Sequence, residues 1–259
     1  PYDQEFATFP WSVRMGLKVD RLFRGRLSRE MAAIVTFSDA EVIFGQRTIR
    51  ISNGVDFDSI PVHQYQPPED GSVHLIGVAE VHLWHGYDRL IAGLGEYYKH
   101  TENPRKVIFH IVGGVHPHER YKSNVFHPGL QTIIDNYGIQ DKVVFHGQLF
   151  GEQLDEVFNQ CCFAIGSLAR HRSGITVIKT LKNREYATRG IPFIYSEQDS
   201  DFDHQPYIVK VVPDETPIDI QQILDFIDAN HFNPADIRKT VEHLTWKTQM
   251  KRVVDEVWK

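Results

Sequence analysis

The chain has 259 residues, of which 41% are hydrophobic and 24% are charged, as expected for a globular protein with a sizeable core. Its formal net charge of −6 argues against a general nucleic-acid or anionic-membrane surface, so any bound phosphate must meet a local basic cluster. The two cysteines, Cys161 and Cys162, are too few for a disulfide scaffold or a zinc finger. Without a signal peptide or a bilayer-length apolar run, we expect a protein of the reducing cytoplasm.

Residues 1–70 are predicted to hold one long helix and two short strands. Apolar and basic side chains recur at helical spacing over residues 11–31, and the apolar run 32–37 predicts a buried strand. Residues 41–44 are interpreted as a connection and residues 48–52 as the second strand. Residues 64–71, with two consecutive prolines, are the most linker-like stretch, so we place the boundary between two lobes there.

After this linker, apolar strand-like runs alternate with amphipathic helical segments. Such alternation predicts an α/β fold, with a parallel sheet covered by helices on both faces. The first lobe is too short for a complete doubly wound domain, so it is either a small accessory lobe or part of a Rossmann-like domain whose front half is missing. We favour the second alternative, and the lack of an initiator Met agrees with it. The expected strands lie at 73–81, 106–112, 142–145, 162–165, 191–195 and 207–212, and the expected helices at 85–98, 121–136, 151–160, 218–230 and 235–258.

The stretch from Arg172 to Gly190 is the candidate active site. It connects two strand-like runs as the crossover of a βαβ unit, and ligands of open α/β sheets bind at the carboxyl ends of the strands. A spacing of three residues places Lys179, Lys182 and Glu185 along one helical face. The helix N-terminus and the two lysines suit an anion, whereas the carboxylate suits a hydroxyl group.

Several short patterns follow one another in the order known from one enzyme family. They are the turn Asn53-Gly54-Val55-Asp56, Gly86 at a strand-to-helix turn, Val143-Val144-Phe145-His146-Gly147 before a helix that starts with Glu152, Ser167 at a strand end, Glu185-Tyr186-Ala187-Thr188-Arg189-Gly190-Ile191-Pro192, and Thr245-Trp246 in the last helix. This order, which covers nearly the whole chain, resembles the GT-B glycosyltransferases, in particular the group-1 or family-4 type that builds bacterial surface polysaccharides.

The resemblance implies a GT-B fold in which residues 71–234 form a complete Rossmann-like nucleotide-sugar domain. Residues 1–70 would be part of the N-terminal, acceptor-side domain, and residues 235–259 a C-terminal helix that crosses back to it. The implied activity is the transfer of a sugar from a nucleotide-diphosphate donor to a glycan or lipid-linked acceptor, with retention of configuration and without a cofactor or an obligatory metal. The implied location is the cytoplasm, at or near the inner face of the membrane.

The sequence departs from the family in its phosphate contacts. Typical members carry an Arg and a Lys five residues apart before the first helix of the donor domain, where they contact the donor diphosphate. Here those positions hold Glu80 and His85, and a carboxylate cannot cradle a diphosphate. We therefore expect the positive charge to have moved to the loop 172–190, where Arg172 and Lys182 would neutralise the diphosphate.

A second departure concerns a pair of glutamates that typical members carry eight residues apart. Glu185 matches the second and would accept hydrogen bonds from the ribose hydroxyls, whereas Val177 stands at the position of the first. The pattern Leu-Lys-x-Arg-Glu-Tyr before a Gly-Ile-Pro strand is similar to a subgroup of these enzymes, so the change need not mean loss of function.

A wider set of donor contacts is expected at the strand ends and in the loop after Ser167. The resemblance places the nucleobase at Gly147 and Gln148, where the family holds it largely through main-chain atoms. Two glycines after a strand also permit close approach of the backbone. The candidate catalytic residues are Arg172, Lys182 and Glu185, and the candidate donor-binding residues are His85, Gly86, Gly113, Gly147, Gln148, Ser173, Gly174 and Lys179.

No motif predicts a metal site. Residues 199–203 come closest to a metal-binding Asp-x-Asp motif, but they follow their strand by several residues and are interpreted as a polar loop. His116, His118 and Glu119 lie in a polar stretch without a clear fourth ligand.

Two other functions stay open on the sequence. A sugar-nucleotide 2-epimerase shares the two-domain architecture and would interconvert a free donor without an acceptor. A non-catalytic donor domain would instead scaffold a polysaccharide assembly complex.

Overall fold

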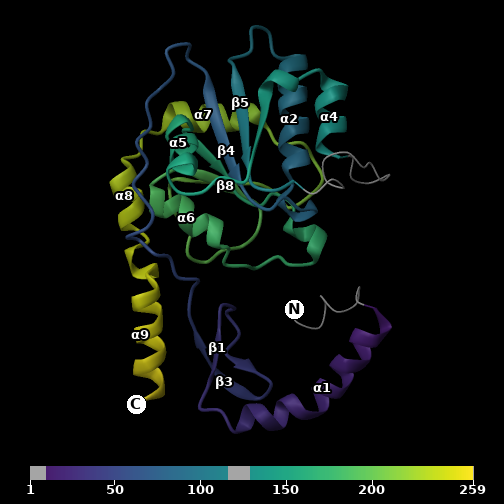
Figure 1. Cartoon of the computed structure of the whole chain (residues 1–259), viewed down its shortest axis with the longest axis vertical. Coiled ribbons are helices and arrows are strands. Elements are labelled where there is room, and N and C mark those ends of the chain that lie inside the picture. Colours follow the sequence, from purple (N-terminus) through teal and green to yellow (C-terminus); the bar gives the residue numbers. More distant parts are fainter. Residues whose placement is uncertain (1–9, 116–128, 259) are drawn as a thin grey trace.

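The computed structural model describes residues 10–115 and 129–258. A six-stranded sheet with helices on both faces forms the larger part, and a three-stranded sheet with one long helix forms the smaller part (Figure 1). This architecture confirms the α/β class that the alternation of strands and helices predicted. The strands of the large sheet are β4 (Val73–Val78), β5 (Val107–Val112), β6 (Val143–Gly147), β7 (Phe163–Ile165), β8 (Phe193–Tyr195) and β9 (Ile208–Lys210).

The large sheet is entirely parallel, and its strand order is β6-β5-β4-β7-β8-β9. The chain therefore runs outward from β4 to β6 and then returns to pair β7 with the other side of β4, in the register Leu75 to Phe163. The strand order reverses between β4 and β7. In open α/β sheets the crevice at such a switch point is where ligands bind.

Helices cover both faces of the large sheet, and alternate strand residues supply two separate cores. Leu75 and Phe109 belong to the first core and Ile76 and Phe193 to the second, all of them fully buried. Burial of each such side chain contributes about 1.5–3 kcal/mol. The first core is closed by α2 (Tyr87–His100), α4 (Leu130–Tyr137) and α7 (Ile220–Ala229), and the second by α5 (Glu152–Gln160), α6 (Leu181–Arg189) and α8 (Pro234–Lys239).

Three histidines are hydrogen-bonded in a row across β4, β5 and β6. Nδ1 of His74 lies 2.8 Å from Nε2 of His110, whose Nδ1 lies 2.8 Å from Nε2 of His146. The Ser72 hydroxyl lies 3.0 Å from Nε2 of His74. Burial lowers the pKa of all three imidazoles, and that of His110 to about 4. The rings are therefore neutral at pH 7, so each can donate one hydrogen bond and accept another along the row.

The small sheet has the order β1-β3-β2, with β1 parallel and β2 antiparallel to β3. Its elements are α1 (Trp11–Arg29), β1 (Ile34–Thr36), β2 (Val42–Ile43) and β3 (Gln46–Arg50). The long helix is confirmed. Two expectations were wrong: residues 41–44, interpreted as a connection, contain β2, and the strand expected to be buried is partly exposed, with Val35 at 44%. A three-residue strand in so small a sheet has too little cover to bury its side chains.

The expected helix over residues 235–258 is broken into two. After α8 the chain makes a short 3-10 turn (Glu242–Leu244), and α9 (Trp246–Val257) follows. The break covers residues 240–245, and the hydroxyl of Thr245 accepts a hydrogen bond from the backbone N–H of Thr248 at 3.1 Å, which caps the start of α9. Local capping chemistry therefore ended a pattern that looked continuous.

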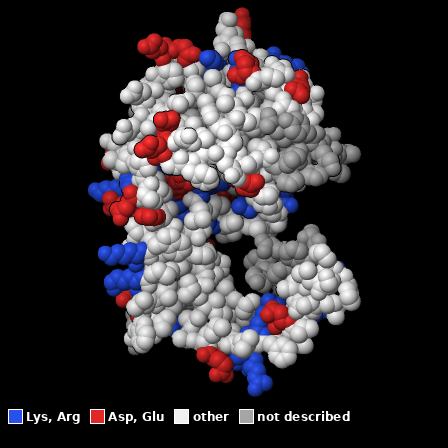
Figure 2. All heavy atoms as spheres, in the orientation of Figure 1, with Lys and Arg blue, Asp and Glu red and all other residues white. Residues whose placement is uncertain are grey.

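The helix α9 lies beside the small sheet (Figure 1). The backbone N–H of Ser52 donates to the side chain of Gln249 at 2.8 Å, and Val55 pairs with Thr245 as an isolated bridge. The helix therefore places the end of the chain against residues near its beginning. Charged side chains of both signs lie close together where the larger and smaller parts meet (Figure 2).

The helix expected over residues 121–136 is described only from Leu130 onward, as α4. Residues 116–128, and with them His116, His118 and Glu119, lie outside the described residues. Within the described ranges no helix combines the length and the apolar character needed to cross a membrane.

Candidate active site

Two loops meet at the switch point between β4 and β7. The backbone N–H of Leu168 donates to the carbonyl of His85 at 2.9 Å, and that of Ala169 to the carbonyl of Trp84 at 3.3 Å. Gly86 makes this contact possible, because its φ is +66° and a Cβ there would lie 2.9 Å from the Ala169 nitrogen. The loop after β7 is thereby joined to the start of α2.

Buried polar groups without hydrogen-bond partners gather around this junction. Buried polar atoms in proteins are nearly always hydrogen-bonded, so such a group indicates a place where a polar ligand or water completes the bonding. Within the described residues, the atoms concerned at this junction are the Tyr87 hydroxyl, the Ser167 hydroxyl, the Lys182 ammonium, the Asn183 side-chain amide and both carboxylate oxygens of Glu197. We call these five residues the polar cluster.

Lys182 brings the positive charge of the polar cluster. It is the second residue of α6, and its Nζ is buried 5.5 Å from the ring centre of Tyr87. Burial lowers the pKa of this ammonium to about 7, with Glu197 raising it and Arg170 lowering it further. A bound anion would favour the charged form of this lysine.

Glu197 brings the negative charge, and sequence reasoning missed it. It lies two residues after β8 and is 2% exposed. Burial raises the pKa of its carboxyl to about 7, against the opposite effects of its own backbone N–H and of the charges of Lys182 and Arg170. Its position directly after a strand was the one available signal, but a single Glu after a strand is common on protein surfaces.

His85 contributes a neutral imidazole beside Lys182. Its Nδ1 accepts a hydrogen bond from the backbone N–H of His82 at 2.9 Å, so the ring proton sits on Nε2. Burial, followed by the charges of Lys182 and Arg170, lowers the pKa of His85 far below its ordinary value. The ring therefore offers one N–H donor and no charge at neutral pH.

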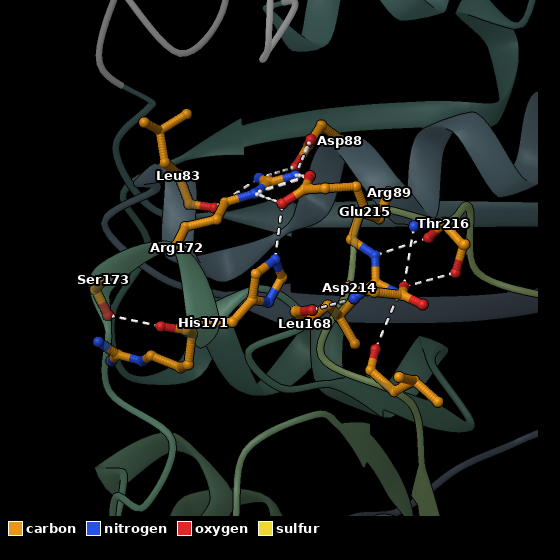
Figure 3. Close-up of polar contacts among 12 residues, drawn as sticks. Leu83, Asp88, Arg89, Leu168, His171, Arg172, Ser173, Asp214, Glu215 and Thr216 are labelled. Carbon is orange, nitrogen blue, oxygen red and sulfur yellow. Dashed lines mark hydrogen bonds and ion pairs between the residues drawn. The ribbon is translucent and has the colours of Figure 1, made fainter.

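Arg172 clamps the loop after β7 to α2 (Figure 3). It forms two hydrogen bonds to the carboxylate of Asp88, at 2.9 and 2.7 Å, and donates to the carbonyl of Leu83 at 2.9 Å. Its remaining N–H groups meet Glu215, whose pKa this arginine lowers to about 2. A guanidinium has five N–H donors, and all five are used within the chain.

A second arginine extends the same clamp (Figure 3). Arg89 is 3% exposed, donates to the carbonyls of Leu168 and Thr216, and pairs with Asp214 at 2.9 Å. The two arginines therefore bind the loops after β7 and β9 to α2. On this geometry Arg172 positions a loop, and its predicted contact with a diphosphate stays a prediction that would require the clamp to open.

Comparison of the structure with solved structures finds similar proteins, whereas comparison of the sequence does not. No protein-family model and no curated protein matches the sequence. Sucrose-phosphate synthase from Thermosynechococcus elongatus matches with a TM-score of 0.67 at 16% identity, over 93% of this chain and 62% of that one. HepE from Anabaena, in a structure with UDP, matches with a TM-score of 0.66 at 16% identity, over 90% and 65%.

This chain has the GT-B glycosyltransferase fold. The pneumococcal O-GlcNAc transferase GtfA, in a structure with UDP and GlcNAc, has the same fold at a TM-score of 0.57 and 16% identity, over 91% of this chain and 47% of that one. The chain thus spans less than two thirds of the length of these enzymes. The fold class predicted from the order of the sequence patterns is confirmed.

Within the GT-B fold, the expected row of Lys179, Lys182 and Glu185 on one helical face was wrong. The helix α6 starts at Leu181, so Lys179 precedes it, and its Nζ lies 3.7 Å from Asp201 at the side of the small sheet. The backbone before α6 is extended, with ψ of 144° at the capping residue, which ends the helical spacing.

Glu185 lies one turn further along α6 than Lys182, but its carboxylate contacts a residue outside the polar cluster. Its carboxylate pairs with Arg189 at 3.0 Å, and Arg189 also pairs with Asp155 of α5 at 2.6 Å. The structure therefore brings Lys182 and His85 together but not Glu185 with them. A role of Glu185 at the ribose stays a prediction.

The two predicted strand-end glycines serve the backbone of the sheet. Gly113 has a φ of +123°, and a Cβ there would lie 1.9 Å from the carbonyl oxygen of Ala79. Its N–H donates to the carbonyl of Gly147 at 2.7 Å, and Gln148 follows as an exposed residue. Both glycines lie at carboxyl ends of strands, on the edge of the sheet where the polar cluster also lies.

Ser173 and Gly174 end the 3-10 turn η4 (Arg170–Ser173) that carries Arg172. The Ser173 hydroxyl donates to the carbonyl of Arg170 at 2.8 Å, and Gly174 takes a left-handed φ of +70°. Both residues are accounted for by the shape of the turn, and their contact with a donor stays a prediction.

The run 199–203 is a polar loop, as predicted, and its carboxylates belong to a largely buried ion-pair network. Asp199 and Arg184 are both fully buried and meet at 2.8 Å. Asp201 also pairs with Arg184 and accepts a hydrogen bond from Ser52 at 2.6 Å. The network ties α6 to the segment that follows the small sheet, so these carboxylates are already occupied by protein cations.

Proposed function

We propose that this chain carries the donor site of a glycosyltransferase that moves a sugar from a nucleotide-diphosphate donor to a glycan or lipid-linked acceptor. The observation that carries the proposal is the polar cluster, because its unpartnered groups lie at the switch point of a GT-B fold. HepE structures with UDP-glucose and the GtfA structure with UDP and GlcNAc support this reading, since those neighbours hold sugars and uridine nucleotides in the same fold.

The chemistry requires a positive charge where the diphosphate departs, and Lys182 supplies it. Stabilising the charge that develops on a leaving group is usually the largest single contribution to such catalysis. The N-terminus of α6 adds its partial positive charge at the same place, because Lys182 stands in the first turn of the helix. His85 can donate its Nε2 proton to a phosphate or sugar oxygen without adding charge.

The reaction is proposed to retain the anomeric configuration and to use Lys182 in place of a divalent cation. The retention of configuration rests on the family-4 resemblance. The charge argument rests on the buried ammonium, which a diphosphate would keep protonated. Product analysis by NMR and activity in excess EDTA test these two points separately.

A calorimetric donor screen tests the function itself. We expect the folded 259-residue chain to bind at least one of UDP-glucose, UDP-N-acetylglucosamine and GDP-mannose, with micromolar to millimolar affinity. The variant Lys251→Met is the matched control, because that lysine is exposed on α9 and lies outside the polar cluster. Absence of binding for every nucleotide-diphosphate sugar, with a cooperative unfolding transition intact, would overturn the proposal.

A further inference from the structure

The GT-B resemblance predicts a carboxylate at a position where this chain has Val177. That residue is 47% exposed and its backbone forms a bridge with Gln198. The N–H of Ile178 donates to the carbonyl of Gln198 at 3.0 Å, and the N–H of Gln198 donates to the carbonyl of Thr176 at 2.8 Å. The segment after β8 therefore lies directly against the position of the absent glutamate.

Side chains alternate along this segment, and the alternation turns Glu197 inward. Gln198 is exposed, whereas its neighbours Glu197 and Asp199 are 2% and 0% exposed. The backbone is held on both sides, because the Ser196 N–H donates to the carbonyl of Ser167 at 2.9 Å and Lys210 donates to the carbonyl of Glu197. The orientation of Glu197 is thus set by the turn at the end of β8.

The two buried carboxylates of this turn differ in their partners. Asp199 is matched by Arg184, whereas neither oxygen of Glu197 accepts a hydrogen bond from another described residue. Lys182 is near enough to influence it, yet the lysine Nζ is also unpartnered. Each group therefore has hydrogen-bonding capacity that a third molecule could use.

The chemistry of that molecule follows from the two charges. A carboxylate repels phosphate but accepts hydrogen bonds from hydroxyl groups, whereas an ammonium attracts phosphate. A ligand with a phosphate next to a polyhydroxyl group meets both requirements. In a nucleotide-sugar, the sugar is attached to the second phosphate, so the two groups are adjacent.

We propose that Glu197 binds hydroxyl groups of the donor sugar and so supplies, from the turn after β8, the carboxylate that is absent at Val177. The inference rests on the proposed function, since it requires a nucleotide-sugar at the polar cluster. Glu197 recognises the sugar, and Lys182 holds the phosphate. The base and ribose are bound elsewhere along the strand ends.

The test compares two probes on one variant. Calorimetry measures the affinity of Glu197→Gln for the nucleotide-sugar that binds best in the donor screen, and for the corresponding nucleoside diphosphate without sugar. We expect at least a tenfold loss of affinity for the nucleotide-sugar and less than a twofold loss for the nucleoside diphosphate. Glu102→Gln, on an exposed loop, is the matched control and should bind both as the wild type does.

The outcomes separate this inference from the proposed function. If the wild type binds the nucleotide-sugar and Glu197→Gln binds it within twofold, or loses both probes equally, the role of Glu197 is refuted while the donor site stands. If the wild type binds neither probe, the proposed function fails and this inference fails with it. A thermal unfolding scan of Glu197→Gln, with Glu197→Asp as a second variant, shows that a loss of affinity does not come from unfolding.

Discussion

Arg184 offers a direct test of how the larger and smaller parts are held together. The side chain is fully buried, and its partners are Asp199, Asp201 and Ser52. The variant Arg184→Met keeps most of the side-chain volume and the helix propensity but leaves two carboxylates without their cation. Removing one partner of a buried ion pair costs about 3–5 kcal/mol, because the remaining charge stays uncompensated. We expect a fall in Tm of roughly 10 °C for a chain of this size.

The matched control lies on the same helix. Arg189 pairs with Asp155 and Glu185, whose side chains are 27% and 28% exposed, so Arg189→Met leaves charges that water can reach. We expect that variant to lose about 1 kcal/mol, as for a partly exposed ion pair. Urea denaturation followed by circular dichroism measures both. An Arg184→Met variant no less stable than Arg189→Met would refute the reasoning.

The pH dependence of the stability of Arg184→Met is a second test of whether the uncompensated carboxylates cause the loss. Burial raises the pKa of Asp199 even with its arginine present. When the pKa of a carboxyl is higher in the folded state than in the unfolded state, the folded protein becomes relatively more stable as pH falls. The deficit of Arg184→Met should therefore shrink between pH 7 and pH 5, whereas a loss caused only by packing would stay constant.

Two further perturbations follow from the described contacts. Burial lowers the pKa of His110 to about 4, so the stability that comes from its neutral ring is complete above pH 6.5 and falls by about 3 kcal/mol as pH drops from 6.5 towards 4. Between pH 7.5 and pH 4.5, urea denaturation should show a smaller loss of stability for His110→Phe than for the wild type. An equal loss of stability in the two proteins would contradict this. Arg172→Ala releases the loop from Asp88 and Glu215, so amide exchange at residues 168–174 should quicken at least tenfold; unchanged exchange would contradict the clamp.

The regular part of the fold could be predicted from sequence because its signal is local. The apolar run Phe163–Ile165 and the amphipathic helix Tyr87–His100 each carry their own pattern, and their alternation leaves few topologies. The two-residue strand Val42–Ile43 and the break at Thr245 have no such signal. A strand of that length has no period, and a capping threonine looks like any polar residue on a helix face.

The loop and helix that carry the candidate site could be predicted from the sequence, but the contacts of their side chains could not. The βαβ crossover pointed to the loop of Arg172 and to Lys182, and both lie at the switch point. What Arg172 touches depends on Asp88, 84 residues away, so no spacing rule could predict a clamp. Glu197 and Arg184 were missed for a related reason, since a single charged residue is usually solvated and only the fold shows that these two are buried.

The charge of Lys182 is the most direct test of the proposed donor site. Calorimetry with the nucleoside diphosphate selected by the donor screen should show an affinity that falls as pH rises from 7 to 9. The reason is that Lys182 has a pKa of about 7 in the ligand-free protein, and the anion binds its protonated form. Lys182→Met should weaken binding about thirtyfold or more at pH 7 and should lack this pH dependence. Wild-type affinity and pH dependence in Lys182→Met would contradict the assignment of the donor phosphates to this lysine.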